Sequence, residues 1–275
     1  MVSHDDALPV RDSGSWAKHK LFAWHRYLDI VTTAMVDKPQ WKTGVSYVDL
    51  FAGPGVCTIR PSGERIPGSP FIAAHTSKPL SRILLCELDP GLAATCKKRM
   101  DAGPARHRYH FFNGDCNVEI DRIIKELPKG SLTLAFLDPT GLHLHFETVS
   151  KLSEHGPVDL LILFPDAIDI LRNAEHYYFD RTDSNLDLVL GEGSDWRRKK
   201  AALTSNEGSV VRKLFLEIYK SQLERIAGYK YFDDLVIKGP SGPLYRLVFA
   251  TKHQVALDFW NKSVKKELSG QQRLF

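Results

Sequence analysis

The sequence is poor in the features that mark secreted, zinc-binding and membrane proteins. Its 275 residues include four cysteines, without a CxxC pair and without histidines at zinc-finger spacing, which argues against a disulfide framework and a zinc finger. The longest apolar run, Leu160–Phe164, is far shorter than the roughly 20 residues of a membrane-spanning helix. The N-terminal MVSHDDALPV is too acidic and too weakly apolar for a secretory signal. We therefore expect a soluble protein of the cytoplasm.

Two nucleotide-binding motifs are also missing. The sequence has no GxxxxGK followed by Ser or Thr, the loop that holds the phosphates of nucleoside triphosphates. Gly53-Pro54-Gly55 begins a dinucleotide fingerprint, but Thr58 stands where the third glycine is required. The next helix is expected to begin only near Pro70, which disfavours a pyrophosphate bound at its N-terminus. An NAD-dependent oxidoreductase is kept as the second alternative function.

The composition is that of an ordinary globular protein. Hydrophobic residues make up 43% and charged residues 25% of the chain. The net charge of +4 permits a nucleic acid as partner without requiring one. We expect one domain over residues 1–275, with a loose tail at 1–13 and a polar insertion at 166–206 on the substrate or partner side.

Between these segments, strand and helix patterns alternate five times, which is typical of an open α/β sheet with helices on both faces. The terminal pair of strands flanks GPSGP, a hairpin turn. This order resembles a Rossmann-like class I methyltransferase fold, a mostly parallel seven-stranded sheet whose C-terminal hairpin is antiparallel. The predicted strands are Val45–Leu50, Arg82–Glu87, Tyr109–Phe112, Leu132–Leu137, Val158–Phe164, Tyr231–Lys238 and Tyr245–Thr251. The predicted helices are Ser15–Met35, Pro70–Ser77, Pro90–Met100, Asn117–Leu127, Phe146–Glu154, Ser209–Ala227 and Gln254–Leu268.

Acidic residues follow three successive predicted strands. Asp49 ends the first strand in YVDLFAGPG, Glu87 ends the second, and Asp115 follows the third. Each has a simpler explanation, as a turn cap, a surface charge or a helix N-cap respectively. Together, at the carboxyl edge of a parallel sheet, they suit an adenosine with a cationic tail that lacks phosphate. We therefore predict that S-adenosylmethionine binds through Asp49, Phe51, Gly53, Gly55, Glu87 and Asp115.

The fourth strand ends in LAFLDPTGL, beside the first strand in the expected sheet order. Methyl transfer from a sulfonium depends mainly on positioning. The Asp138 carboxylate and the Pro139 carbonyl can accept the N–H groups of an amine, and Gly141 leaves room for a flat base. A plain type I turn explains DPTG equally simply. We predict that Asp138, Pro139 and Gly141 form the catalytic site.

Several motifs together resemble the three-Cys-motif partner protein family: YVDLFAGPG, GSPFIAA, LLCELDP, LAFLDPTGL, HYYFDRTDSNLDLVLGEGSDWR and YRLVFATKH. The resemblance implies a fold like that of S-adenosylmethionine-dependent methyltransferases and a protein partner with a three-cysteine motif. DPTG is also similar to the DPFG of the family that dimethylates guanine N2 in tRNA. It departs from the NPPY or DPPY of most amino-methyltransferases of nucleic acids, because it lacks the second proline and the aromatic residue.

These observations predict an S-adenosylmethionine-dependent enzyme that methylates an exocyclic amine of a nucleic acid, with RNA favoured over DNA. An inactive or weakly active methyltransferase-fold subunit that binds another protein is the first alternative. His143 and His145 form an HxH without a third ligand, so we predict no metal site. Candidate substrate contacts are two aromatic residues for stacking, Phe164 and Tyr177, and two arginines of DWRRKK for phosphates, Arg197 and Arg198. A solvated helix face is the common alternative for such arginines.

Overall fold

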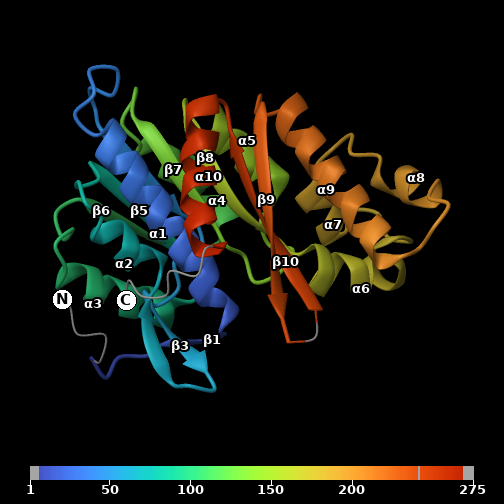
Figure 1. Cartoon of the computed structure of the whole chain (residues 1–275), viewed down its shortest axis with the longest axis horizontal. Helices are drawn as coiled ribbons and strands as arrows, with labels where there is room; N and C mark the ends of the chain where they lie inside the picture. The colour runs from blue at the N-terminus through green and yellow to red at the C-terminus, as the bar shows by residue number, and fades with distance from the viewer. Residues whose placement is uncertain (1–5, 241, 269–275) are drawn as a thin grey trace.

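A seven-stranded sheet organises the computed structural model, which describes residues 6–240 and 242–268 (Figure 1). Residues 1–5 of the predicted tail and Ser241 of the predicted turn lie outside this range. Neighbouring strands are parallel from β6 to β8, whereas β10 is antiparallel to both β8 and β9. The prediction of a mostly parallel sheet with a C-terminal antiparallel hairpin is therefore confirmed. The strand order is β6 (Tyr109–Asn113), β5 (Arg82–Glu87), β2 (Val45–Asp49), β7 (Leu132–Leu137), β8 (Val158–Phe164), β10 (Gly242–Thr251) and β9 (Tyr231–Gly239).

The central strands are the continuous apolar runs of the sequence. Every residue of β2, β7 and β8 is buried, as expected for parallel strands covered on both faces. Asp49, the last residue of β2, pairs with Leu85 of β5 and Phe136 of β7. This register aligns the carboxyl ends of the parallel strands along one edge, where open α/β sheets bind ligands.

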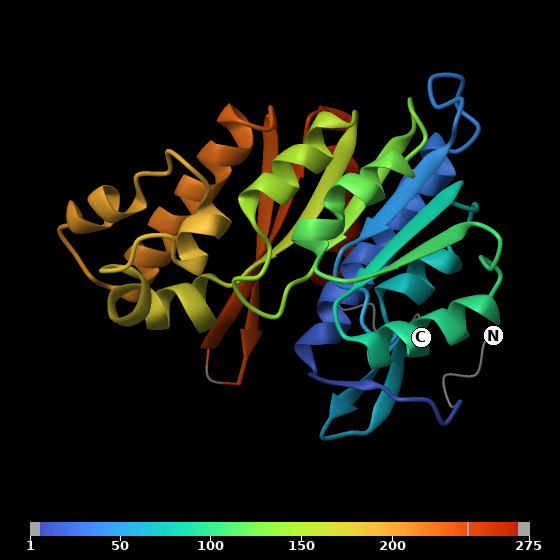
Figure 2. The ribbon, with the colours of Figure 1, turned by 180° about the vertical axis from the view of Figure 1, so that it is seen from behind.

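Helices cover the two faces of the sheet and enclose a separate hydrophobic core on each. Figure 1 shows the face with the N-terminal and C-terminal helices, and Figure 2 shows α4 and α5 on the reverse side. The first face carries α1 (Trp16–Met35), α2 (Ser69–Ala74), α3 (Pro90–Asp101) and α10 (Gln254–Leu268). The second core includes residues of α4 (Cys116–Lys125), α5 (Phe146–Glu154), α7 (Asn185–Leu190), α8 (Trp196–Ala201) and α9 (Gly208–Arg225).

Helix α1 packs on the sheet through residues spaced three or four apart. Ala17, Leu21, Trp24 and Val31 are buried along this stripe, which is the pattern of an amphipathic helix on a core. The Trp24 ring is fully buried and stacks on Phe136 of β7, with 5.4 Å between ring centroids. This packing fixes the start of α1 beside the carboxyl ends of the central strands.

A second, three-stranded sheet occupies two regions that the sequence predicts as irregular. Strand β1 (Arg11–Gly14) pairs in parallel with β3 (Val56–Arg60), and β3 pairs with β4 (Glu64–Pro67). Residues 11–13 of the predicted tail and much of the predicted loop after Leu50 are thus strands. They escape prediction because β1 is short and polar and is held by main-chain hydrogen bonds to β3, which leave no apolar periodicity in the sequence.

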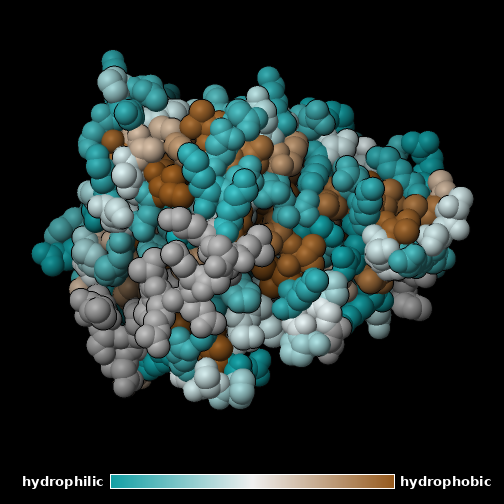
Figure 3. Space-filling view, in the orientation of Figure 1, coloured by the Kyte–Doolittle hydropathy of each residue, from teal (hydrophilic) through white to brown (hydrophobic). Residues whose placement is uncertain are grey.

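The predicted insertion at 166–206 is mostly helical. It contains two π-helical turns, Asp166–Ile170 (η1) and Ala174–Tyr178 (η2), together with α6 (Leu171–Asn173), α7 and α8. On the side of the molecule that carries α1, hydrophobic residues lie in separate areas among hydrophilic ones (Figure 3). Within the described parts of the chain, no helix is long and apolar enough to cross a membrane.

Candidate functional site

The glycine loop after β2 is folded tightly against the end of β5. Gly53 and Gly55 have φ values of +60° and +85°, a region that glycine enters without the Cβ penalty of other residues. The Gly53 N–H donates to Glu87 Oε2 at 2.8 Å, and the Gly68 N–H donates to the Gly55 carbonyl at 2.8 Å. The loop is therefore fixed both to the acid at the end of β5 and to the residue that precedes α2.

Arg99 of α3 holds the same loop from its outer side. Its guanidinium donates to the Pro54 carbonyl at 2.7 Å and to the Pro9 carbonyl at 2.9 Å. It also pairs with Asp6, whose pKa it lowers. Since Arg99 is only 3% exposed, one buried cation joins the glycine loop to the N-terminal segment.

Asp49 lies beneath the loop and lines neither of the two cavities described below. Its side chain is fully buried and accepts hydrogen bonds from the Phe51 N–H at 3.1 Å and the Tyr47 hydroxyl at 3.3 Å. Burial raises its pKa to about 7, against the hydrogen bonds from Ser69 and Phe51 that lower it. Asp49 thus shapes the loop from below. The structure does not bring it to a position where it could contact a ligand, as the sequence predicts.

A cavity of about 250 Å³, which we call the strand-end cavity, lies at the carboxyl ends of β2, β5 and β6. Glu87 lines it and is 8% exposed; its other oxygen, Oε1, accepts from the Asp89 N–H at 3.0 Å. Asp115 also lines it and caps α4 through the Asn117 N–H at 2.8 Å. Capping and a place at the cavity therefore coexist in Asp115, and Leu88 adds an apolar wall.

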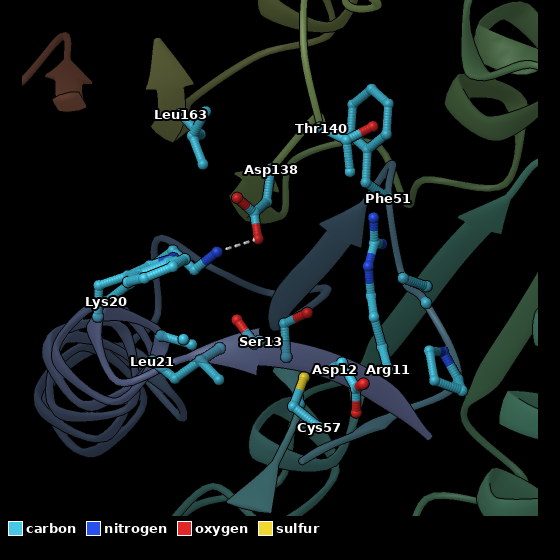
Figure 4. Close-up of a pocket in the computed structure, with 18 of the residues that line it drawn as sticks. Arg11, Asp12, Ser13, Lys20, Leu21, Phe51, Cys57, Asp138, Thr140 and Leu163 are labelled. Atoms are coloured by element: carbon cyan, nitrogen blue, oxygen red, sulfur yellow. Dashed lines mark hydrogen bonds and ion pairs between the residues drawn. The ribbon is translucent and has the colours of Figure 1, made fainter. Parts of the chain in front are cut away.

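A second cavity of about 290 Å³, which we call the α1 cavity, adjoins the first. Asp138 and Pro139, which follow β7, line it together with Lys20 of α1 and Tyr245 of β10. Figure 4 shows Lys20 reaching from its helix towards the Asp138 carboxylate. Residues that line both cavities mark their junction: Arg11, Phe51, Asp138 and Thr140.

The Lys20–Asp138 ion pair is the main electrostatic feature of the α1 cavity. The Lys20 ammonium donates to Asp138 Oδ2 at 2.5 Å, and the two side chains are 11% and 21% exposed. Burial lowers the pKa of Lys20, but the charges of Asp138 and Tyr245 outweigh this, and its pKa is raised overall. Lys20 therefore remains an ammonium ion at neutral pH and holds the Asp138 carboxylate at the cavity wall.

The structure brings most of the predicted cofactor and catalytic residues to the two cavities. Gly141 is an exception, because it is buried beside His143 and Asp169 and lines neither cavity. The predicted residues that line one or both cavities are Phe51, Gly53, Gly55, Glu87, Asp115, Asp138 and Pro139.

The four predicted substrate residues lie elsewhere. Phe164 points into the core on the opposite face of the sheet, where it stacks on Tyr219 at 4.8 Å. Tyr177 is 57% exposed on η2. The two arginines are used by acids of their own region: Arg197 pairs with Asp187 and Arg198 with Asp195. None of these four lines either cavity.

Three lining residues were not predicted from the sequence: Arg11, Lys20 and Tyr245. Lys20 carries a signal in retrospect, since it is a charged residue among the apolar positions Ala17, Leu21 and Trp24 of one helix face. Arg11 and Tyr245 carry none, because their places depend on how β1 and β10 pair with distant strands.

Comparison with known proteins supports the fold. No family model and no curated protein matches the chain, so the resemblance to the three-Cys-motif partner family stays a prediction. Protein LPL1258 from Legionella pneumophila has a TM-score of 0.53 and 13% identity, over 93% of this chain and 92% of that one.

Two other solved structures are O-methyltransferases. One, from Bacillus cereus in complex with SAH, has a TM-score of 0.48 and 11% identity, over 89% of this chain and 84% of that one. The other, TomG from Streptomyces achromogenes in complex with SAM, has a TM-score of 0.45 and 11% identity, over 84% and 80%. At such identities a likeness to known structures speaks to the fold, and the strand order observed here is that of a Rossmann-like methyltransferase sheet.

Proposed function

We propose that this chain is an S-adenosylmethionine-dependent methyltransferase that acts on an exocyclic amine of a nucleic acid, with RNA favoured over DNA. The observation that carries the proposal is the pair of adjoining cavities with Asp138 on the wall of both. One cavity suits an adenosine and the other an acceptor. Their junction is where a methyl group would pass from one to the other.

The residues of the strand-end cavity fit this cofactor. The Glu87 carboxylate suits the ribose hydroxyls, because each carboxylate oxygen accepts more than one hydrogen bond. Asp115 suits the adenine amino group, and Leu88 offers a surface for the flat ring. Arg11, at the junction, suits the carboxylate of the amino-acid end.

A dinucleotide fits less well. Its pyrophosphate would lie at the N-terminus of the helix after the glycine loop. At the start of α2, the Gly68 N–H already donates to the Gly55 carbonyl, and Ser69 is buried against the Asp49 carboxyl. Protein groups thus fill the position that a phosphate would take, which disfavours the NAD-dependent alternative.

The chain's own part in the reaction is to hold the acceptor amine. When bound, the cofactor supplies a methyl group on a sulfonium, which becomes a thioether as the acceptor nitrogen takes the methyl group and loses a proton. The Asp138 carboxylate and the Pro139 carbonyl accept the amine N–H groups and so aim the nitrogen lone pair. The aromatic walls that DPTG lacks are supplied in the α1 cavity by Trp16 and Tyr245.

The proposal is tested by calorimetric titration of the protein with S-adenosylmethionine, S-adenosylhomocysteine and NAD, followed by labelled-methyl transfer to RNA, DNA and protein. We expect binding of the two sulfur compounds near micromolar Kd, about −8 kcal/mol, with no binding of NAD and with label entering nucleic acid. Binding without transfer to any acceptor would support the partner-subunit alternative instead. NAD binding alone would overturn the proposal.

A further inference from the structure

The hydroxyl of Tyr245 is a polar group of the α1 cavity that the proposed function leaves without a task. Tyr245 is 4% exposed and lines this cavity. Within the part of the chain that the structure describes, its hydroxyl is buried without a hydrogen-bond partner. Buried hydroxyls are ordinarily paired, because leaving one unpaired is costly. The hydroxyl is therefore suited to a partner that a bound molecule provides.

Strand register explains why this hydroxyl lies at the site. Arg246 pairs with Phe164 of β8 in the antiparallel ladder. Because side chains alternate along a strand, Tyr245 and Leu247 project to the face that carries α1, and both belong to its core. The Lys20 ammonium lies over the Tyr245 ring, 5.7 Å from its centroid. Tyr245, Lys20 and Asp138 thus form one polar group on the cavity wall.

The hydrogen-bonding roles within this group are fixed by its chemistry. Lys20 can only donate, and it donates to Asp138 Oδ2. Asp138 Oδ1 accepts no hydrogen bond from the described residues other than any that a bound molecule would bring. The positive charge over the Tyr245 ring draws electron density from it and favours its hydroxyl as a donor. The cavity therefore offers an acceptor at Asp138 beside donors at Tyr245 and Lys20.

We propose that the α1 cavity recognises a heterocycle edge on which an amine N–H lies beside a ring acceptor, with the N–H bound by Asp138 and the acceptor by the Tyr245 hydroxyl. The inference rests on the proposed function and narrows its substrate. Adenine and cytosine present this edge, since the amine of each neighbours an unprotonated ring nitrogen. The guanine amine lies beside N1–H, a donor that would face the donors of the cavity. The acceptor is thus a 6-aminopurine or a 4-aminopyrimidine, in contrast to the guanine suggested by the similarity of DPTG to DPFG.

The experiment uses unmodified random-sequence RNA and labelled S-adenosylmethionine, with digestion to nucleosides and identification of the labelled one. We expect label on the amine of adenosine or cytidine. Label on guanosine would overturn this inference and leave the proposed function standing. Absence of label from every nucleoside, in a protein that binds S-adenosylhomocysteine, would overturn the proposed function itself.

Tyr245→Phe isolates the hydroxyl. We expect it to raise KM for the RNA about tenfold, the value of one hydrogen bond to a buried group, with kcat and the Kd for S-adenosylhomocysteine little changed. Tyr219→Phe is the matched control, because Tyr219 is equally buried but packs in the core of the opposite face. An unchanged KM in Tyr245→Phe would remove Tyr245 from substrate recognition.

Discussion

The strand-end cavity and the α1 cavity adjoin one another but are built in different ways. The acids of the strand-end cavity, Glu87 and Asp115, stand at or just after the ends of neighbouring parallel strands. The polar groups of the α1 cavity come from segments far apart in the chain: Arg11 from β1, Lys20 from α1 and Tyr245 from β10. The first cavity is a product of the sheet order, whereas the second depends on what is packed around the sheet.

This difference separates what is general from what is specific. Any open sheet of this order aligns its strand ends along one edge, so a cofactor site there needs only suitable residues in short loops. The walls of the α1 cavity are set by a helix, a hairpin and an additional sheet, which vary independently of the strand order. We therefore expect the choice of acceptor to depend on the α1 cavity, and cofactor affinity to depend on the strand-end cavity.

The largest expected effect concerns Asp49, which we assign to the fold and to neither cavity. Its pKa of about 7 in the folded protein exceeds the ordinary value of 3.8, so the folded state binds the extra proton between these values. The stability that this group contributes is complete below pH 4 and is lost as pH rises through 7, by up to about 4 kcal/mol. Urea unfolding of the wild type and of Asp49→Asn across pH 4–8 measures it.

In Asp49→Asn this decline should be absent, so the difference in unfolding free energy between the two proteins changes steadily with pH. Parallel curves for the two proteins would show that Asp49 is ionised in the fold. In that case it would again be a candidate for contact with the cofactor.

Mirrored substitutions test the division of labour between the cavities. Asp138→Asn should lower kcat about 100-fold by mispositioning the amine, with the Kd for S-adenosylhomocysteine little changed. Glu87→Gln should raise that Kd about 30-fold by weakening hydrogen bonds to a charged group, with a smaller effect on kcat at saturating cofactor. Calorimetry and single-turnover transfer assays distinguish the two. Equal losses of binding and transfer in both variants would merge the two cavities into one functional unit.

Lys20→Met asks whether the ion pair also stabilises the α1 cavity. Removal of Lys20 leaves the Asp138 carboxylate largely buried without its partner, and we expect a loss of about 2 kcal/mol in the free energy of unfolding. The double variant Lys20→Met with Asp138→Asn should recover much of this loss, because no charge is then left unpaired. Urea denaturation measures all three proteins, and additive losses in the double variant would argue against coupling of the two residues.

Arg11 tests the junction of the cavities and carries the smallest of these effects. Arg11→Gln should weaken S-adenosylhomocysteine about tenfold by removing a charged partner of its carboxylate. The affinity for 5′-methylthioadenosine, which lacks the amino-acid end, should stay the same. Equal weakening of both ligands in calorimetric titrations would place Arg11 against the adenosine.

The sequence allows the sheet and the strand-end cavity to be predicted because their signals are local. Continuous apolar runs predict β2, β7 and β8, and the acid of the strand-end cavity at Glu87 follows directly from where β5 ends. The face on which a residue lies is harder to predict, since a shift of one position reverses it. Leu163 lines the α1 cavity, whereas its neighbour Phe164 packs in the opposite core.

The α1 cavity is beyond such prediction for a related reason. Its polar group requires that Lys20 be buried by tertiary packing and that Tyr245 be placed by antiparallel pairing with β8. Arg197 and Arg198 show the converse, because their basic charge suggests phosphate contacts, yet the acids that bind them, Asp187 and Asp195, lie nearby in the folded chain.

The three-stranded sheet of β1, β3 and β4 has its own hydrogen-bonded ladder, separate from that of the seven-stranded sheet. Cys57 and Arg60 of β3 line the α1 cavity but not the strand-end cavity. Substitutions on this small sheet can therefore change the shape and charge of the acceptor pocket while the strands that hold the cofactor keep their register. For an enzyme under selection for a new substrate, or for an engineer, the hairpin is an exchangeable module attached to a constant catalytic frame.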